Sequence, residues 1–325
     1  MDIVMPRGLT LDGQTHPTQD AVYLTSYPRC GSTWFRYCFE FITKTASNPE
    51  LDPTWETGAS LPQFLYSSHK FADSPYGLDF PTPLAPLQTI WLRRNPVEAI
   101  ASQAVNAIKA AERKTSEIPG YTIKMVKSFP VYAKLRKEMN MSDSSSSTEI
   151  LHFYETVCLE SEDVAMGPLL ADIGSYYNKL VGHIFVGQEQ FGLALRYEDL
   201  VEKPDKTLLQ LIDYLVRNNP DRFERSTLLQ NLEELLENYA FHQEAAMNTY
   251  RGAQQTNIGA STKDGISDLN HYTDLLSPEF LELFEKKTQH VWNIIVEVQP
   301  RDESRPLLKR AYYKYMNCYD RRWRQ

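Results

Sequence analysis

The sequence lacks any long apolar run: none of its uninterrupted apolar stretches reaches the roughly 18 residues that a membrane-spanning helix needs. Residues 1–20 also lack the apolar core of a secretory signal peptide. Only four cysteines are present, at positions 30, 38, 158 and 318, and their spacing fits neither a paired zinc pattern nor a disulfide framework. We therefore expect free thiols, no membrane span and a cytoplasmic location.

An excess of positive charge is missing as well. The 325 residues include 34 Lys and Arg against 42 Asp and Glu, a formal net charge of −8. General nucleic-acid binding requires a basic face, so this balance argues against that class but leaves room for a local cationic pocket. Apolar residues at 42% and aromatic residues at 12% exclude a disordered chain and indicate a globular protein.

Short runs of strand-forming residues alternate with segments of helical periodicity. Strands are expected over 21–27, 64–68, 87–92 and 191–196, and helices over 34–44, 96–112, 150–165, 168–181, 206–216 and 228–239 and from Ser277 onward. This alternation predicts an α/β fold with a parallel sheet and helices on both faces. We expect one domain over residues 21–325, preceded by a polar arm at 1–20.

Two segments read as long loops. Residues 121–148 lose periodicity and end in a serine-rich stretch, and residues 251–270 are rich in Gly, Ser, Thr, Asn and Asp. Loops over about 112–148 and 253–270 are therefore candidate lids over a site. The sequence also contains a strong helix start before the first of these loops. Asn95 is the expected N-cap of that helix, and Glu98 completes a capping box.

Ligands of such sheets bind beyond the carboxyl ends of the strands, where residues 26–34, 93–102 and 196–199 stand. The first of these segments reads SYPRCGSTW: a strand end, a turn with one glycine, two hydroxyls and a helix. Helix N–H groups, the two hydroxyls and the Arg29 guanidinium all favour a phosphate. A plain helix cap beside a surface arginine is the alternative interpretation.

The segment is not a nucleoside triphosphatase P-loop, because the first glycine and the lysine of that motif are absent. The strand over 87–92 leads into Arg93 and Arg94, where such an enzyme needs an acidic residue for Mg²⁺. Arg94 precedes a helix start and offers a second anion site, with Ser102 eight residues on. Two anion sites predict a ligand with two phosphates and no metal; a surface ion pair of Arg94 is the alternative.

These segments resemble the nucleotide motifs of sulfotransferases that use 3′-phosphoadenosine-5′-phosphosulfate (PAPS). SYPRCGSTW is similar to the family's 5′-phosphosulfate loop, roughly TYPKSGTTW, and RNPVEAIAS at 94–102 to its 3′-phosphate motif. LRYEDLVEKP at 195–204 is similar to its YEDLxxxP strand end, YRG at 250–252 to its RKG motif, and LNHYT at 269–273 to a remnant of WKNxFT. The motifs occur in the family's order.

The resemblance implies three groups of nucleotide-binding residues. Arg29, Cys30, Gly31, Ser32 and Thr33 would hold the 5′-phosphosulfate; Trp34, Tyr197 and Phe241 would contact adenine; Arg94, Ser102, Arg251 and Gly252 would bind the 3′-phosphate. It also implies a P-loop-like strand–loop–helix for the phosphosulfate.

The resemblance further implies that His69 is the general base. A neutral imidazole with a pKa of about 6.5 can accept a hydroxyl proton at neutral pH. From the residues alone, a single histidine at a strand end is more often structural. Ser67 stands where the family has a lysine two residues before this histidine, and whether Lys70 replaces that lysine is open.

The resulting hypothesis is a PAPS-dependent sulfotransferase that needs no metal. It transfers the sulfuryl group to a hydroxyl or amine of a small-molecule acceptor, such as a natural product or an alkaloid, and leaves adenosine 3′,5′-bisphosphate. Arg29 would act in catalysis with His69. The alternatives are a nucleotide-dependent kinase or phosphotransferase and a catalytically inactive nucleotide-binding homologue. We expect no nucleic-acid or membrane partner, and a homodimer is left open.

Overall fold

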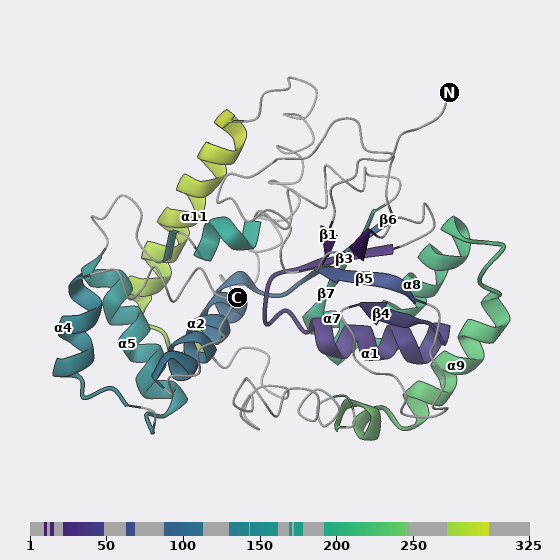
Figure 1. Ribbon diagram of the computed structural model, residues 1–325, viewed down its shortest axis with the longest axis horizontal. Helices are drawn as coiled ribbons and strands as arrows, with labels where there is room; N and C mark the ends of the chain where they lie inside the picture. The colour runs from purple at the N-terminus through teal and green to yellow at the C-terminus, as the bar shows by residue number, and fades with distance from the viewer. Residues whose placement is uncertain are drawn as a thin grey trace. The chain divides into compact units, whose positions relative to one another are not determined.

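The computed structural model describes residues 10–11, 14–15, 22–48, 63–68, 88–112, 130–142, 144–161, 169–170, 172–177, 192–244, 246 and 272–298 (Figure 1). The chain divides into two compact units. The first comprises Met1–Arg94 and Lys179–Ala253, and the second comprises Asn95–Asn178 and Gln254–Gln325. The single domain expected over 21–325 stays a prediction.

The first unit is built on a parallel sheet whose described strands run in the order β4-β5-β3-β6-β7. These strands are β3 (Val22–Ser26), β4 (Ala46–Asn48), β5 (Gln63–Ser68), β6 (Gln88–Arg93) and β7 (Gly192–Arg196). All the neighbouring pairs are parallel. The predicted α/β fold is therefore confirmed, and the four strands expected from the sequence are present. A short antiparallel hairpin, β1 (Thr10–Leu11) with β2 (Gln14–Thr15), lies in the expected arm.

The described part of the same unit includes the helices α1 (Ser32–Thr43), α7 (Tyr197–Glu202), α8 (Pro204–Asn218) and α9 (Arg225–Glu237). The apolar positions of α8 and α9 recur at helical spacing, which is why the sequence predicted both helices. α1 and α8 each pack against α9 (Figure 1). Together with the inner positions of the strands, such as Leu24, Leu92 and Leu195, these helices form one apolar core. Helices on both faces of the sheet stay a prediction.

The second unit is helical in its described residues, with α2 (Pro96–Glu112), α4 (Pro130–Glu138), α5 (Ser147–Glu160), the 3₁₀ turn η2 (Thr273–Leu275) and α11 (Pro278–Val298). α2, α4 and α11 all pack against α5. The helices expected from Asn95 and Ser277 are thus confirmed. None of the described helices is at once long and apolar enough to cross a bilayer.

The long loop expected over 121–148 is wrong in its second half. Residues 130–138 form α4, whose Tyr132 ring packs edge-on against Phe153 of α5, with the ring centroids 5.1 Å apart. Ser146 of the serine-rich stretch caps α5: its side chain accepts from the Glu149 N–H, and the Glu149 carboxylate accepts from the Ser146 N–H. Serine composition indicated flexibility here, whereas the spacing from Ser146 to Glu149 specifies a helix start. The second expected lid, 253–270, lies outside the described residues.

Two buried carboxylates fix the turns of the second unit. Glu98 accepts hydrogen bonds from the backbone N–H of Thr273 at 2.6 Å and from the Thr273 hydroxyl at 2.6 Å. Asn95 caps α2 as expected, since its side chain accepts from the Val97 N–H at 3.0 Å. The Glu98 carboxylate therefore holds the turn before α11 as well as standing in the first turn of α2.

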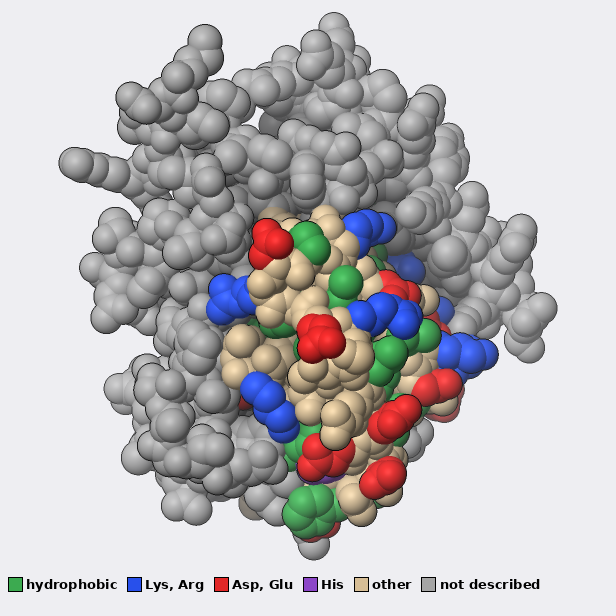
Figure 2. Space-filling model, turned by 90° about the vertical axis from the view of Figure 1, so that its right-hand side faces the viewer, with side chains coloured by type: hydrophobic (Ala, Val, Ile, Leu, Met, Phe, Trp, Pro, Cys, Tyr) green, Lys and Arg blue, Asp and Glu red, His purple; other side chains and the backbone are tan. Residues whose placement is uncertain are grey.

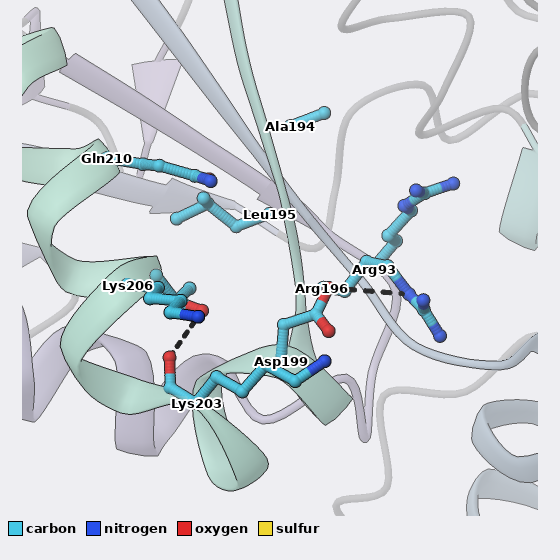
Figure 3. A pocket seen from close by; sticks show the side chains of 9 residues that line it. Arg93, Ala194, Leu195, Arg196, Asp199, Lys203, Lys206 and Gln210 are labelled. Atoms are coloured by element: carbon cyan, nitrogen blue, oxygen red, sulfur yellow. Dashed lines mark hydrogen bonds and ion pairs between the residues drawn. The ribbon is translucent and has the colours of Figure 1, made fainter.

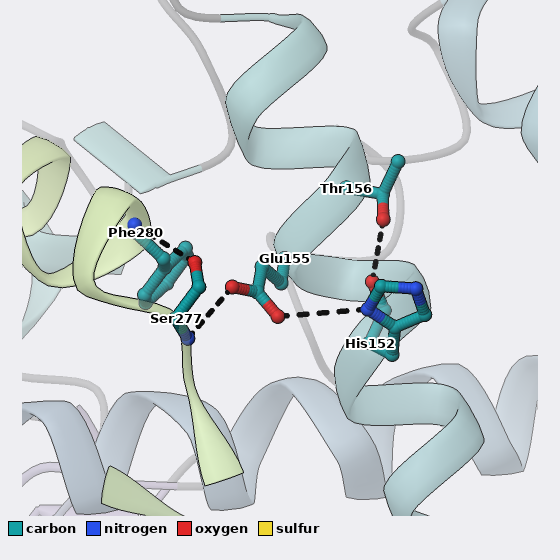
Figure 4. A network of polar contacts seen from close by, with 5 residues as sticks. All are labelled: His152, Glu155, Thr156, Ser277 and Phe280. Atoms are coloured by element: carbon teal, nitrogen blue, oxygen red, sulfur yellow. Dashed lines mark hydrogen bonds and ion pairs between the residues drawn. The ribbon is translucent and has the colours of Figure 1, made fainter.

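Glu155 of α5 performs a similar task at the start of α11 (Figure 4). Its Oε1 accepts from the Ser277 N–H at 2.9 Å, and Ser277 Oγ accepts from the Phe280 N–H at 3.2 Å. The other carboxylate oxygen faces His152 Nδ1 at 3.6 Å. Helix α11 is thus capped by its own serine and tied to α5 by a buried carboxylate.

We expect Glu98→Gln to lower the free energy of unfolding by about 1–3 kcal/mol, because an amide replaces a charged acceptor of several buried donors. Urea unfolding followed by circular dichroism measures this loss. Glu160→Gln is the matched control, because Glu160 is exposed and only pairs with Lys134 across 3.8 Å; such pairs contribute less than about 1 kcal/mol. Equal losses in the two variants would contradict the role of Glu98.

Candidate functional site

The carboxyl ends of three adjacent strands meet at one edge of the sheet. Ser26 of β3, Leu92 of β6 and Leu195 of β7 lie at one level, because Leu92 pairs in register with both of the others. In parallel strands all residues that follow these three emerge at the same edge. The loop after β3, Arg94 after β6 and Tyr197 after β7 are therefore brought together within the first unit.

The loop between β3 and α1 has an unusual backbone. The Cys30 N–H donates to the Tyr27 carbonyl at 3.2 Å, which closes a tight turn. Arg29 has a φ of 69° and Gly31 a φ of 81°, so both lie in the left-handed region. A residue with a side chain costs about 1–2 kcal/mol in that region, and such strain clusters at functional sites. The loop therefore holds the Arg29 backbone in the left-handed region, which an arginine rarely adopts.

Gly31 ends this loop as the N-cap of α1, and the Phe35 N–H donates to its carbonyl at 3.0 Å. Glycine has no side chain to cap the helix, and the first turn of α1 contains no acidic residue. The N–H groups and partial positive charge at this end are therefore not neutralised by a carboxylate of that turn. Ser32 and Thr33 add two partly exposed hydroxyls. These groups can together receive an anion.

Tyr197 and Arg94 complete the arrangement. The ring of Tyr197 lies so close to Gly31 that a Cβ atom there would overlap it. The Arg94 guanidinium lies 5.2 Å from the centre of the same ring, and its Nη1 donates to the Arg29 carbonyl at 3.2 Å. Tyr197 and Arg94 are only 5% and 6% exposed. We call Arg29, Gly31, Arg94 and Tyr197 the strand-end cluster.

The charges of the cluster belong to its arginines. Burial raises the pKa of Tyr197, although the neighbouring Arg94 and Arg29 oppose that shift, so the phenol stays neutral at physiological pH. Burial also raises the pKa of the Cys30 thiol to about 12, against the effect of Arg94. Cys30 is therefore a protonated, buried thiol and not a nucleophile. A ligand at this edge of the sheet would meet two cations and a helix N-terminus.

The aromatic residues expected at adenine are placed differently from one another. Trp34 is only 5% exposed: its ring stacks on Tyr37 at 5.6 Å, and its Nε1 donates to the Tyr239 hydroxyl at 3.0 Å. Phe241 is 68% exposed and lies beside the ring of His242 at 5.5 Å. The contacts of Trp34 thus run into the apolar core, and an aromatic slot between Trp34 and Phe241 stays a prediction.

The remaining expected residues fall elsewhere in the chain. Ser102 is buried on α2, in the second unit. His69, Arg251 and Gly252 lie outside the described residues. The structure therefore brings together Arg29, Cys30, Gly31, Arg94 and Tyr197, with Ser32 and Thr33 at the adjoining helix start.

Two further cations stand at the same edge: Arg93, which sequence reasoning named without assigning it a ligand, and Arg196, which it did not single out. Arg93 and Arg196 are the last residues of β6 and β7, and they pair with each other in register. Each stands immediately before a residue of the strand-end cluster. The sequence signal was present, since Arg93 follows the strand expected over 87–92 and Arg196 ends the strand expected over 191–196, but their pairing depends on the register of the sheet.

We expect Gly31→Ala to lower the free energy of unfolding by about 1–3 kcal/mol, because the new Cβ meets the Tyr197 ring on a left-handed backbone. Gly174→Ala is the matched control, because nothing lies within 4 Å of its Cβ and its backbone is helical. That control should be neutral or gain about 0.5–1 kcal/mol. Urea unfolding measures the free energy of unfolding of both variants. An unchanged free energy of unfolding in Gly31→Ala would rule out the close contact.

Comparison with models of known protein families gives no match for this chain. A search of curated proteins likewise finds no significant match. The function is therefore inferred from the motifs of the chain and from the geometry of the strand-end cluster.

Proposed function

We propose that the chain is a PAPS-dependent sulfotransferase that acts on a hydroxyl or amine of a small-molecule acceptor. The observation that carries this proposal is the strand-end cluster, in which Arg29, Gly31, Arg94 and Tyr197 meet at the carboxyl edge of a parallel sheet. These residues come from three of the motifs that resemble the sulfotransferase family. In this proposal the segment from β3 to α1 is a P-loop-like strand–loop–helix for the phosphosulfate.

The donor set fits an anionic nucleotide. Ser32, Thr33 and the N–H groups that begin α1 would hold the 5′-phosphosulfate, together with the Arg29 guanidinium. Arg94 would bind the 3′-phosphate, for which Ser102, Arg251 and Gly252 are the further expected ligands. A buried arginine needs compensating partners, and Arg94 has the Arg29 carbonyl and the Tyr197 ring on the protein side.

The adenine base would lie near the start of α1, where Tyr197 and Trp34 both stand. Both rings are almost fully buried, so stacking of the base requires one ring to become more exposed when the nucleotide binds. Exposed Phe241 could then cover the opposite side of the base. Binding of adenine by this chain would therefore require a side-chain rearrangement, whereas a site with a preformed slot would not.

PAPS would supply a sulfuryl group that is already activated by its bond to phosphate. His69 would accept the proton of the acceptor hydroxyl while the acceptor oxygen bonds to sulfur and the sulfur–oxygen bond to the 5′-phosphate breaks. Arg29 and the α1 N–H groups would stabilise the negative charge left on adenosine 3′,5′-bisphosphate. The protein's contribution is therefore positioning and electrostatic stabilisation, as in phosphoryl transfer.

Calorimetry tests the nucleotide. Adenosine 3′,5′-bisphosphate should bind one site per chain with the same affinity in Mg²⁺ and in a chelator, because the proposed ligands are arginines, hydroxyls and N–H groups. Adenosine 5′-monophosphate is the control and should bind at least tenfold more weakly, because it lacks the group that Arg94 would hold. Tight binding of ATP only in Mg²⁺ would instead indicate a kinase or another phosphotransferase. Nucleotide binding without turnover on any acceptor would indicate an inactive homologue.

Two substitutions separate binding from chemistry. Arg94→Ala should weaken binding of adenosine 3′,5′-bisphosphate by about ten- to a hundredfold, the loss of a charged hydrogen-bond donor. His69→Ala should leave that affinity unchanged and lower turnover of PAPS by about 10²–10⁴-fold in an acceptor panel. Circular dichroism checks that both variants fold, and Arg94→Lys should show an intermediate loss of affinity. Equal loss of nucleotide binding in the two alanine variants would contradict the assigned roles.

A further inference from the structure

A cavity of about 290 Å³ lies beside the edge strand β7 in the first unit (Figure 3). The ends of β6 and β7, helix α7 and the first half of α8 supply its walls. Its lining residues are Arg93, Ala194, Leu195, Arg196, Asp199, Lys203, Lys206, Thr207 and Gln210. Four of these side chains are cationic and one, Asp199, is anionic, so the lining has a formal charge of 4 − 1 = +3.

The register of the sheet places two of these cations side by side. Arg93 ends β6 and Arg196 ends β7, and their Cα atoms are partners in the parallel pair. Like charges in direct register are destabilising. Two carboxylates stand near Arg196, whose Nε lies 3.6 Å from Glu198 and 3.9 Å from Asp199. Both separations exceed a hydrogen-bond length.

Two of the cationic lining residues, Lys203 and Lys206, stand at the start of α8. Lys203 is the N-cap of this 15-residue helix and makes no side-chain capping hydrogen bond, and Pro204 follows it. The side chain of Thr207 donates to the Lys203 carbonyl at 3.0 Å, which holds the first turn in place. Lys203 and Lys206 therefore stand at a fixed helix end, whose first turn also contains Asp205.

This concentration of cations is local. The whole chain carries a net charge of −8. On the face that Figure 2 shows, basic and acidic side chains are interspersed across the described part of the surface. A cavity lining with a formal charge of +3 in an acidic chain attracts a small anion.

We propose that this cavity binds a compact oxyanion, a sulfate or phosphate group, at a site separate from the strand-end cluster. The two arginines offer forked donors that match the oxygens of such a group, and the two lysines offer point charges. Its volume accommodates either a free ion with water or the ester group of a larger molecule. The proposed sulfotransferase activity assigns no ligand to this cavity.

Calorimetry on the full chain tests the proposal, first with adenosine 3′,5′-bisphosphate at saturation to occupy the strand-end cluster. Inorganic sulfate, inorganic phosphate and phenyl phosphate are the probes, at constant ionic strength. We expect saturable binding at one further site. Binding of the inorganic ions identifies a free anion as the ligand, whereas binding of phenyl phosphate alone identifies an ester group. Failure of all three probes to bind overturns the proposal.

Substitutions in the cavity lining test whether the probe binds in this cavity. The double variant Lys203→Gln with Lys206→Gln should weaken the probe that binds by at least tenfold, and Gln210→Glu should do the same by adding a carboxylate to the lining. All three positions are exposed, so folding is not at risk. Arg217→Gln, an exposed position near the far end of α8, removes a positive charge outside the cavity and should leave binding unchanged. Unchanged binding in both cavity variants overturns the proposal.

The same measurements without nucleotide distinguish failure of the proposed sulfotransferase function from failure of the proposed oxyanion site. If adenosine 3′,5′-bisphosphate does not bind, the proposed sulfotransferase function fails, yet the effect of Gln210→Glu on sulfate or phosphate binding still reports on the cavity. If the nucleotide binds and the cavity variants behave as wild type, only the oxyanion site is lost.

Discussion

The close approach of the Tyr197 ring to Gly31 is the contact on which the proposed site depends. It requires a residue without a Cβ atom, and the left-handed backbone of Gly31 also favours glycine. Because the ring also lies under the Arg94 guanidinium, one aromatic side chain links the ends of β3, β6 and β7. The position of Arg94 relative to the start of α1 follows from this stack, and with it the spacing of the two cations that would meet a nucleotide with two phosphate groups.

The carboxyl edge of the sheet collects positive charge in an otherwise acidic chain. Arg29 and Arg94 belong to the strand-end cluster, while Arg93 and Arg196 line the neighbouring cavity. Arg93 and Arg94 are separated by a single step at the end of β6, and successive residues of an extended chain point in opposite directions. One short sequence, Arg93-Arg94, thus contributes to two cationic environments, one buried beside an aromatic ring and one open to a cavity.

Local patterns predicted most of the described elements. Asn95 before Pro96, and Ser277 before Pro278, marked two helix starts, because a cap and a proline act within one turn of the backbone. The loop assigned to 121–148 failed where composition was given more weight than spacing: Tyr132 and Leu135 pack as α4, and Ser146 with Glu149 forms a capping box. Strand β4 was missed because three residues carry too little periodicity to be recognised.

The sequence alone determined the parallel α/β unit, the helix starts and the positions of the motif residues at strand ends, since all of these depend on signals within a few neighbouring residues. Only the tertiary structure decided that Trp34 lies in the core with its Nε1 on Tyr239, and that Arg93 pairs with Arg196. Trp34 and Tyr239 are 205 residues apart, so their contact depends on the packing of α1 beside α9. The pairing of the arginines depends on strand register, which is set by how whole strands bury their apolar side chains.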